Sequence, residues 1–150
     1  MELTSPEFEN GEMIPARYTC DDENISPPFE IIDIPEGTKS FVLTMTDPDA
    51  PNGAFIHWTV WNISPITTYI EEDSPPPEAV QGKTSSGKTG YSGPCPPRGE
   101  THRYFFNLYA LTTEIRLAED ATIEKLEAHI EGNELAVATL MGKYERNLQP

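Results

Sequence analysis

Two stretches near the middle of the chain have the residue pattern of buried β-strands. In residues 41–47 alternate positions share one face of an extended chain, and this face carries Phe41, Leu43, Met45 and Asp47. Residues 55–63 are nearly all aromatic or β-branched. Because this density blurs the alternation, we expect the second strand to be buried on both faces.

A third strand is predicted for residues 104–111. If the strand extends back to residue 102, one face carries His102, Tyr104, Phe106 and Leu108. Between the second and third strands, residues 64–101 are irregular and contain five of the ten glycines and many prolines. A loop of this length is uncommon unless it is functional.

One helix is predicted near the end of the chain. Thr122 is a suitable N-cap, apolar residues follow at helical spacing, and Gly132 suits the position after the helix. Residues 135–144 are apolar at nearly every position, so periodicity permits a strand or a second helix, and we favour the strand. The pattern predicts a mainly β fold, an antiparallel β-sandwich with one or two peripheral C-terminal helices.

Length and charge restrict the class of protein. The 150 residues suit one domain, with 25 acidic and 10 basic side chains and a net charge of −15. This balance argues against nucleic-acid binding and stable membrane association, since both need clustered Lys and Arg. The sequence shows no targeting segment, so we expect a cytoplasmic protein. The oligomeric state, monomer or homodimer, is left open.

The two cysteines do not form a recognisable motif. Cys20 and Cys95 lack CxxC spacing, which argues against a zinc site or a redox motif. Free thiols are the simplest interpretation, and a Cys20–Cys95 bridge is left open because both lie in turn-rich segments.

Residues 82–89 match the phosphate-loop pattern GxxxxGK[ST]. A nucleotide-binding loop requires a buried strand before it and a helix after it. Here Pro75-Pro76-Pro77 lies upstream, and Pro94, Pro96 and Pro97 lie downstream. Because proline breaks both elements, we reject nucleotide hydrolysis.

Charge in residues 82–104 is opposite to that of the whole chain. Four basic residues stand against one acid, Glu100, and the segment also carries His102 and five glycines. Glycine lets backbone N–H groups converge on an anion, so the segment could form a small anion site. The alternative is a flexible loop with solvated lysines.

Three polar residues occur at the predicted strands, namely Asp47, His57 and His102. If they converge, two imidazoles would donate hydrogen bonds to a phosphate-like anion, with Asp47 fixing the tautomer of one ring. The same atoms would suit a metal, but the short His spacings typical of such sites are missing, and we expect no metal and no cofactor. Acid–base hydrolysis by His57 and His102 is a weaker alternative.

Four segments together resemble the phosphatidylethanolamine-binding protein family, in its bacterial and archaeal branch related to Raf kinase inhibitor protein. They are Tyr18-Thr19-Cys20-Asp21 with Asn24-Ile25-Ser26-Pro27-Pro28, Asp47-Pro48-Asp49-Ala50-Pro51, His57-Trp58, and Gly90-Tyr91-Ser92-Gly93-Pro94-Cys95-Pro96-Pro97 with His102-Arg103-Tyr104. The resemblance spans nearly the whole chain. It departs from the family pattern at Asp22 and at Phe29-Glu30-Ile31, so the pocket rim is expected to differ there.

The resemblance implies a Greek-key sandwich with a small pocket for phosphate or phosphorylated head groups. It assigns the ligand-binding positions to Asp47, His57, Gly93, Pro94, His102 and Tyr104. Supporting positions are Asp49, Pro51, Gly90 and Arg103, with Asp49 and Arg103 as an ion pair at the rim.

Members of this family are described as head-group binders, kinase-cascade modulators or serine-protease inhibitors, so the fold does not decide the role. We expect a non-enzymatic binding protein for a small anion. The rival hypothesis is an inhibitor or modulator of a protease or kinase that acts through the loop at residues 75–97.

Overall fold

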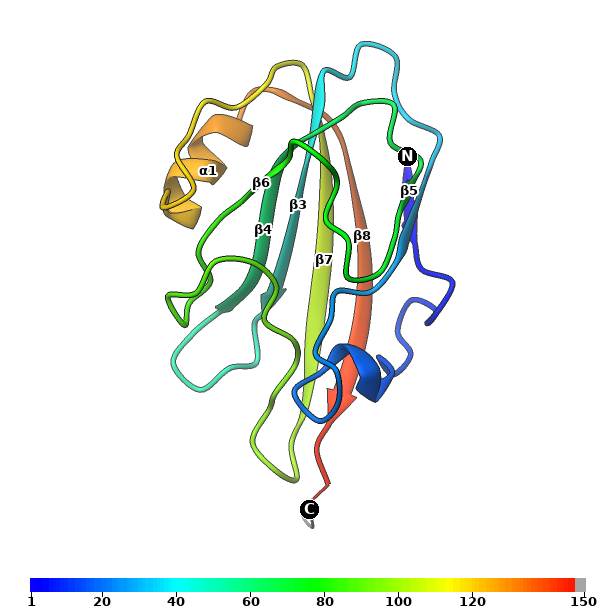
Figure 1. Cartoon of the computed structure of the whole chain (residues 1–150), viewed down its shortest axis with the longest axis vertical. Coiled ribbons are helices and arrows are strands. Elements are labelled where there is room, and N and C mark those ends of the chain that lie inside the picture. Colours follow the sequence, from blue (N-terminus) through cyan, green and yellow to red (C-terminus); the bar gives the residue numbers. More distant parts are fainter. Residues whose placement is uncertain (148–150) are drawn as a thin grey trace.

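The structure, a computed structural model, describes residues 1–147 of the chain. Its elements follow in the order β1 (Glu2–Thr4), a 3-10 turn (Ala16–Tyr18), β2 (Phe29–Ile32), β3 (Ser40–Asp47), β4 (Phe55–Ile63), β5 (Tyr69–Ile70), β6 (Val80–Gln81), β7 (Thr101–Leu111), α1 (Ile123–Ile130) and β8 (Glu134–Glu145). Figure 1 shows the long strands side by side, with α1 at one flank.

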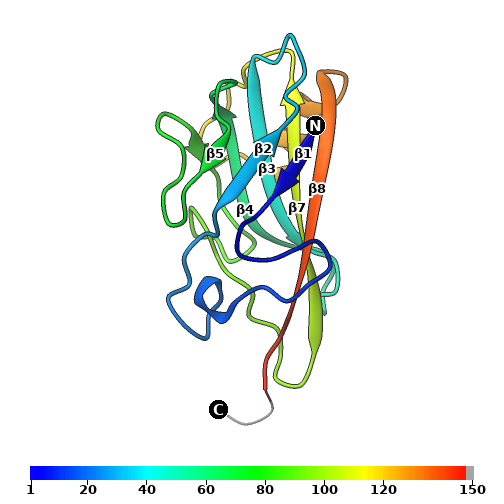
Figure 2. The ribbon, with the colours of Figure 1, turned by 90° about the vertical axis from the view of Figure 1, so that its right-hand side faces the viewer.

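Two antiparallel sheets form the sandwich. The larger sheet has the strand order β6-β4-β3-β7-β8, and the smaller one has the order β1-β2-β5. Figure 2 shows the short strands of the smaller sheet lying over the long strands of the larger one. The chain crosses between the sheets more than once, because β2 and β5 belong to the small sheet and the β3–β4 hairpin between them to the large one. The predicted antiparallel Greek-key β-sandwich is confirmed.

The core between the sheets is aromatic and aliphatic. Phe29 of β2 and Phe106 of β7 join the two layers with ring centroids 5.0 Å apart. On the opposite face of the large sheet, Leu126 and Ile130 of α1 pack with Trp61 of β4 in a second cluster. Both faces of β3 and β4 are therefore covered, which explains why their alternation is blurred in the sequence.

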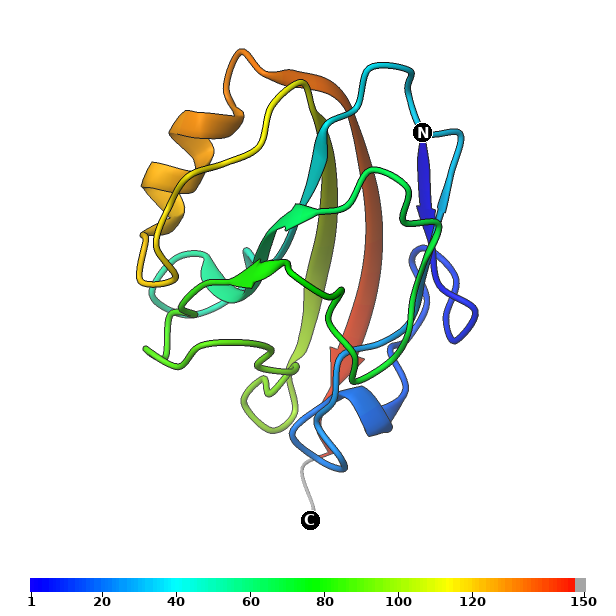
Figure 3. The same ribbon diagram turned by 45° about the horizontal axis from the view of Figure 1, so that its top comes forward.

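The predicted helix is confirmed as α1. The Thr122 hydroxyl accepts a hydrogen bond from the Lys125 N–H at 3.3 Å, and Gly132 takes a positive φ of 81° after the helix. In Figure 3, α1 lies at the flank of the large sheet opposite to β1. Residues 135–144 form a strand, as favoured, so only one α-helix is present in residues 1–147.

Several elements differ from the expectation. The third strand begins at Thr101 instead of Tyr104, and the irregular stretch at residues 64–101 contains β5 and β6. Strands β1 and β2 were not predicted. These four additional strands have two to four residues each, too short for an alternation pattern to develop.

Candidate functional site

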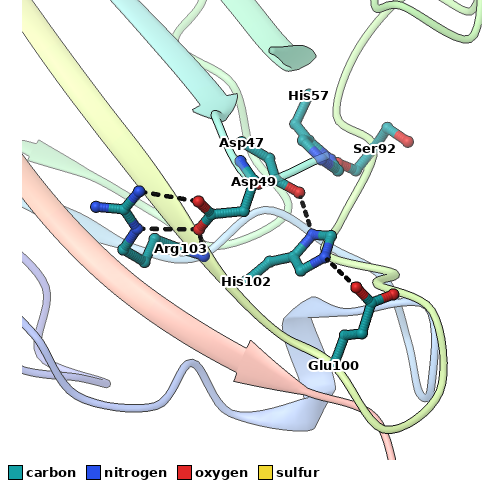
Figure 4. A network of polar contacts seen from close by, with 7 residues as sticks. All are labelled: Asp47, Asp49, His57, Ser92, Glu100, His102 and Arg103. Atoms are coloured by element: carbon teal, nitrogen blue, oxygen red, sulfur yellow. Dashed lines mark hydrogen bonds and ion pairs between the residues drawn. The ribbon is translucent and has the colours of Figure 1, made fainter. Parts of the chain in front are cut away.

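The candidate site lies at one end of the sandwich, where β3 ends and β7 begins. Because these strands are antiparallel neighbours, Asp47 at the end of β3 lies beside His102 at the start of β7. His102 Nδ1 donates a hydrogen bond to Asp47 Oδ2 at 2.7 Å, and both side chains are about 4% exposed. Figure 4 shows this pair with the residues around it.

The second carboxylate oxygen of Asp47 is also occupied. Asp47 Oδ1 accepts the backbone N–H of Asp49 at 2.8 Å, a bond that closes the turn after β3. The carboxylate is held by both oxygens, so it orients His102 and does not itself need to touch a ligand.

Asp49 and Arg103 form the expected ion pair next to this turn. Arg103 Nε and Nη2 donate to the two carboxylate oxygens at 2.9 and 2.8 Å, and the Arg103 backbone N–H donates at 3.0 Å. These bonds from Arg103 lower the pKa of Asp49 to about 2. The pair links the turn to β7, and it neutralises the arginine.

His57 of β4 supplies the second imidazole. Its Nδ1 lies 2.6 Å from the Ser92 carbonyl oxygen, which can only accept, so this nitrogen carries the proton. The ring packs between Phe55 and Tyr104, with centroid distances of 4.7 and 5.2 Å. Burial lowers the pKa of His57, against the opposing effect of the Ser92 carbonyl. His57 therefore favours the neutral ring in the absence of a ligand.

Tyr104 presents a phenol to the same region. Its side chain is fully buried, and burial, together with the charge of Asp47, raises its pKa well above the usual range. The hydroxyl keeps its proton and can donate it in a hydrogen bond.

The segment at residues 91–97 forms the wall opposite β7, and the N-terminal part of the chain holds it. The Gly93 N–H donates to Asn24 Oδ1 at 2.9 Å, and the Cys20 N–H donates to the Pro94 carbonyl at 3.1 Å. A Cβ at Gly93 would lie 2.2 Å from Asn24 Oδ1 and 2.5 Å from the Tyr18 carbonyl oxygen, so glycine is required by space.

Cys20 and Cys95 form a disulfide across this contact, so the free-thiol interpretation is wrong. Disulfides are typical of oxidising compartments and of intracellular proteins from hyperthermophiles. The expected cytoplasmic location stays a prediction, and the disulfide weighs against an ordinary reducing cytoplasm.

These groups surround one cavity of about 170 Å³. Of the residues expected from sequence, six line it, namely Asp47, Pro51, His57, Gly93, His102 and Tyr104. The sequence analysis did not assign the other lining residues, Ala50, Phe55, Ser92, Cys95, Pro96 and Pro97. All of them except Phe55 lie in the two proline-rich motifs that carry the resemblance, so the motifs themselves were the available signal.

Four expected positions do not line the cavity. Asp49 and Arg103 brace the neighbouring turn, and Pro94 contributes its carbonyl to Cys20. Gly90 has a φ of 100° and donates to the Gly82 carbonyl at 3.2 Å, so it shapes the chain before the wall.

The basic residues of 82–104 do not converge on the cavity. Lys83 lies with Asp120 and Thr122 in a separate hollow near the start of α1, and Arg103 is paired with Asp49. The acid Glu100 instead lies close, with its Oε1 3.9 Å from His102 Nε2. Lys83, Lys88, Arg98 and Arg103 therefore do not line the cavity, whereas the imidazoles of His57 and His102 do.

The phosphate-loop-like segment serves a structural purpose. The Ser85 N–H donates to the Ile56 carbonyl, and the Ile56 N–H donates to the Ser85 hydroxyl at 2.8 Å. These bonds fasten the segment to β4 and use its polar groups internally. In residues 1–147, no group of three or more His, Cys, Asp and Glu is placed to hold a metal ion. In that same range, no helix is long and apolar enough to span a membrane.

Comparison with known proteins agrees with this geometry. The family model described as phosphatidylethanolamine-binding protein matches residues 4–145. A UPF0098 protein of Aquifex aeolicus is 48% identical over 153 residues, covering 98% of this chain and 90% of the relative. A UPF0098 protein of Methanothermobacter thermautotrophicus is 46% identical, with coverage of 97% and 99%.

Two solved structures are similar throughout. CT736 of Chlamydia trachomatis, described as a homologue of phosphatidylethanolamine-binding protein, has a TM-score of 0.92 at 41% identity, covering 97% of each chain. Escherichia coli YBCL, described as a member of the mammalian family, has a TM-score of 0.90 at 34% identity, covering 96% of this chain and 97% of its own. The chain therefore belongs to the phosphatidylethanolamine-binding protein family, in its bacterial and archaeal branch.

Proposed function

We propose that this protein binds a small oxyanion, phosphate or a phosphorylated head group, in the cavity between β3, β4, β7 and the segment at residues 91–97. The observation that carries the proposal is the state of the two imidazoles. His57 and His102 line one cavity, and each has its Nδ1 fixed by an acceptor, the Ser92 carbonyl and the Asp47 carboxylate. The second nitrogen of each ring, Nε2, is left for a ligand.

A protonated His102 would strengthen anion binding. When His102 is protonated, the Asp47 carboxylate balances the ring at Nδ1, and the Nε2–H becomes a charge-assisted donor. Charge-assisted bonds are roughly twice as strong as neutral ones, and burial excludes the water that would screen them. The Tyr104 hydroxyl supplies a further donor.

Cavity size favours a head group over a whole lipid. About 170 Å³ is well below the roughly 300–1,000 Å³ of pockets that enclose drug-sized molecules. A phosphate-sized group suits this volume, and a larger ligand would leave its remainder outside.

Membership of a family of binding proteins supports a binding role for this chain. We expect no turnover of the bound anion, and no binding of nucleic acid or stable membrane association.

The rival role, inhibition of a protease or kinase through residues 75–97, stays a prediction. Part of that loop is fixed to the sandwich by β6, the Ser85 contact and the disulfide at Cys95. Its proline run at residues 75–77 is largely exposed. Substitutions there would abolish partner binding and spare anion binding if the rival role holds.

Thermal unfolding with added ligand tests the anion proposal. At pH 5.5, where a phosphomonoester keeps one proton, phosphate and phosphoethanolamine should raise the melting temperature of the wild type at concentrations above the dissociation constant. The rise should vanish in His102→Ala and persist in His129→Ala, which removes an exposed imidazole on α1 far from the cavity. No rise in the wild type at millimolar ligand would overturn the proposal.

A further inference from the structure

The hydrogen-bonding groups of the cavity distinguish ligands that carry a proton of their own from ligands that are fully ionised. With neutral rings, the protons of His57 and His102 are on Nδ1, because Ser92 and Asp47 accept there. Each Nε2 then carries a lone pair and can only accept. A fully ionised oxyanion, which also only accepts, finds no partner at these two atoms.

The rest of the wall offers few compensating donors. Pro51, Pro96 and Pro97 have no backbone N–H. The Gly93 N–H is taken by Asn24, and the Ser92 N–H donates to the His57 carbonyl at 3.0 Å. The Cys95 N–H is directed at the Tyr104 hydroxyl oxygen. At the segment of residues 92–97, the Tyr104 hydroxyl is therefore the donor available to a ligand.

The charged groups around His102 supply no free positive charge. They therefore do not attract a fully ionised anion to the cavity when both imidazoles are neutral. Asp47 of β3 and Glu100 before β7 are acids, and His57 of β4 is the other imidazole. The nearest guanidinium, Arg103, is already paired with Asp49. Tyr104 of β7 keeps its proton.

We propose that, while its imidazoles are neutral, the pocket binds oxyanions that carry their own hydroxyl proton and discriminates against fully ionised anions of the same shape. This inference rests on the proposed anion function and names its ligand class, hydrogen phosphate and singly protonated phosphomonoesters. The ligand hydroxyl donates to an Nε2 lone pair, and the Tyr104 hydroxyl donates to a ligand oxygen. Protonation of the rings at low pH turns both Nε2 atoms into donors and removes the discrimination.

Inorganic phosphate and sulfate are a matched pair of probes. Both are tetrahedral dianions at pH 8.5, and only phosphate keeps a hydroxyl. Calorimetric titration of the whole chain at pH 8.5, where imidazoles are ordinarily neutral, should show phosphate binding about tenfold or more tightly than sulfate, the effect of one hydrogen bond involving a charged group. At pH 5.5 the preference for phosphate over sulfate should shrink, because a protonated Nε2 donates to sulfate and phosphate is then mainly the monoanion.

Three outcomes of this titration are informative. The predicted decrease in preference at pH 5.5 supports the inference. Equal affinity for both anions at pH 8.5 overturns it and leaves the anion pocket standing. Binding of neither anion at either pH overturns the proposed function, and the inference with it.

Asp47→Asn provides a second, opposite test. Because Oδ1 of residue 47 accepts the Asp49 N–H, the new amide would turn its NH₂ towards His102 Nδ1. That nitrogen must then accept, the proton moves to Nε2, and sulfate affinity at pH 8.5 should rise several-fold. Asp120→Asn, the same change in an exposed loop, should leave it unaltered. Unchanged sulfate affinity in a folded Asp47→Asn variant would contradict the inference. If that variant does not fold, the phosphate and sulfate titrations of the wild type are the test.

Discussion

The Asp47 carboxylate accepts the Nδ1 proton of His102 at 2.7 Å, although 55 positions separate the two residues in the chain. The contact arises because β3 and β7 are antiparallel neighbours, so the end of one meets the start of the other. A buried carboxylate beside an imidazole fixes which nitrogen holds the proton. The chemistry of the cavity therefore depends on the Nε2 atom at the opposite side of the ring.

Under the proposed function, Glu100 would compete with a bound anion for this atom when the ring is protonated. Its Oε1 is 3.9 Å from His102 Nε2, and its side chain is 56% exposed, so the carboxylate can turn into solvent. Glu100→Gln should tighten phosphate binding about two- to fivefold, because a negative charge at the rim is removed. Titration calorimetry measures this change. Glu114→Gln, remote from the cavity, is the control, and weaker phosphate binding in Glu100→Gln would contradict the competition.

His57 should make stability fall in mild acid. Burial lowers the pKa of His57, so below the ordinary histidine pKa of about 6.5 the unfolded chain binds a proton that the folded chain does not. Its contribution is complete above that pH and is lost progressively as pH falls below it. Urea unfolding of the ligand-free protein at pH 7.5 and 5 should show this loss.

The variant His57→Gln isolates the effect of this one group. It should be less sensitive to pH over the same interval, whereas His129→Gln should behave as the wild type. An unchanged pH slope in His57→Gln would show that another group is responsible.

The disulfide should stabilise both the fold and the wall of the pocket. Cys20 and Cys95 are 75 positions apart, so their bond closes a long loop in the unfolded chain. Replacing both by serine should lower the free energy of unfolding by about 2–4 kcal/mol and weaken anion binding, since Cys95 lines the cavity. Reductant should destabilise the wild type and leave the double variant unaffected. Two reactive thiols in denatured, unreduced wild type would refute the bond.

Gly93 should tolerate no side chain. Its Cβ would meet Asn24 Oδ1 and the Tyr18 carbonyl, and the second of these is backbone that cannot rotate away. Gly93→Ala should cost about 1–3 kcal/mol of stability, typical of overpacking, and displace the wall. Adding Asn24→Ala removes one of the two clashes, but it also removes the acceptor of the Gly93 N–H, so it should not restore the wild-type stability. Chemical denaturation measures both effects, and a Gly93→Ala variant as stable as the wild type would contradict the packing.

The long strands and the helix could be predicted from sequence because burial and helix ends leave a recognisable pattern of residues. Strands β3, β4, β7 and β8 have 8 to 12 residues, enough to show apolar density or alternation, and Thr122 and Gly132 mark the ends of α1. Strands such as β5, with two residues, depend on pairing with β2 and have no local signal.

Parts of the site also could not be predicted from the sequence. Asp47 and His102 could be related because one lies at the end of its strand and the other next to the start of its strand. The Ser92 carbonyl that fixes His57 is a backbone group, which any residue type would supply, so no sequence pattern indicates it. The basic residues of 82–104 suggested an anion site because they are close in sequence. They are not close together in the structure, and Lys83 lies beside α1 instead of the cavity.

Imidazole nitrogen NMR during a phosphate titration tests the central claim most directly. The ¹⁵N resonances of His57 and His102 should shift together, with the larger change at Nε2 of each ring, while those of His129 stay in place. This result would locate the anion at the two Nε2 atoms. Saturating phosphate that leaves the His57 and His102 resonances unmoved would contradict the account.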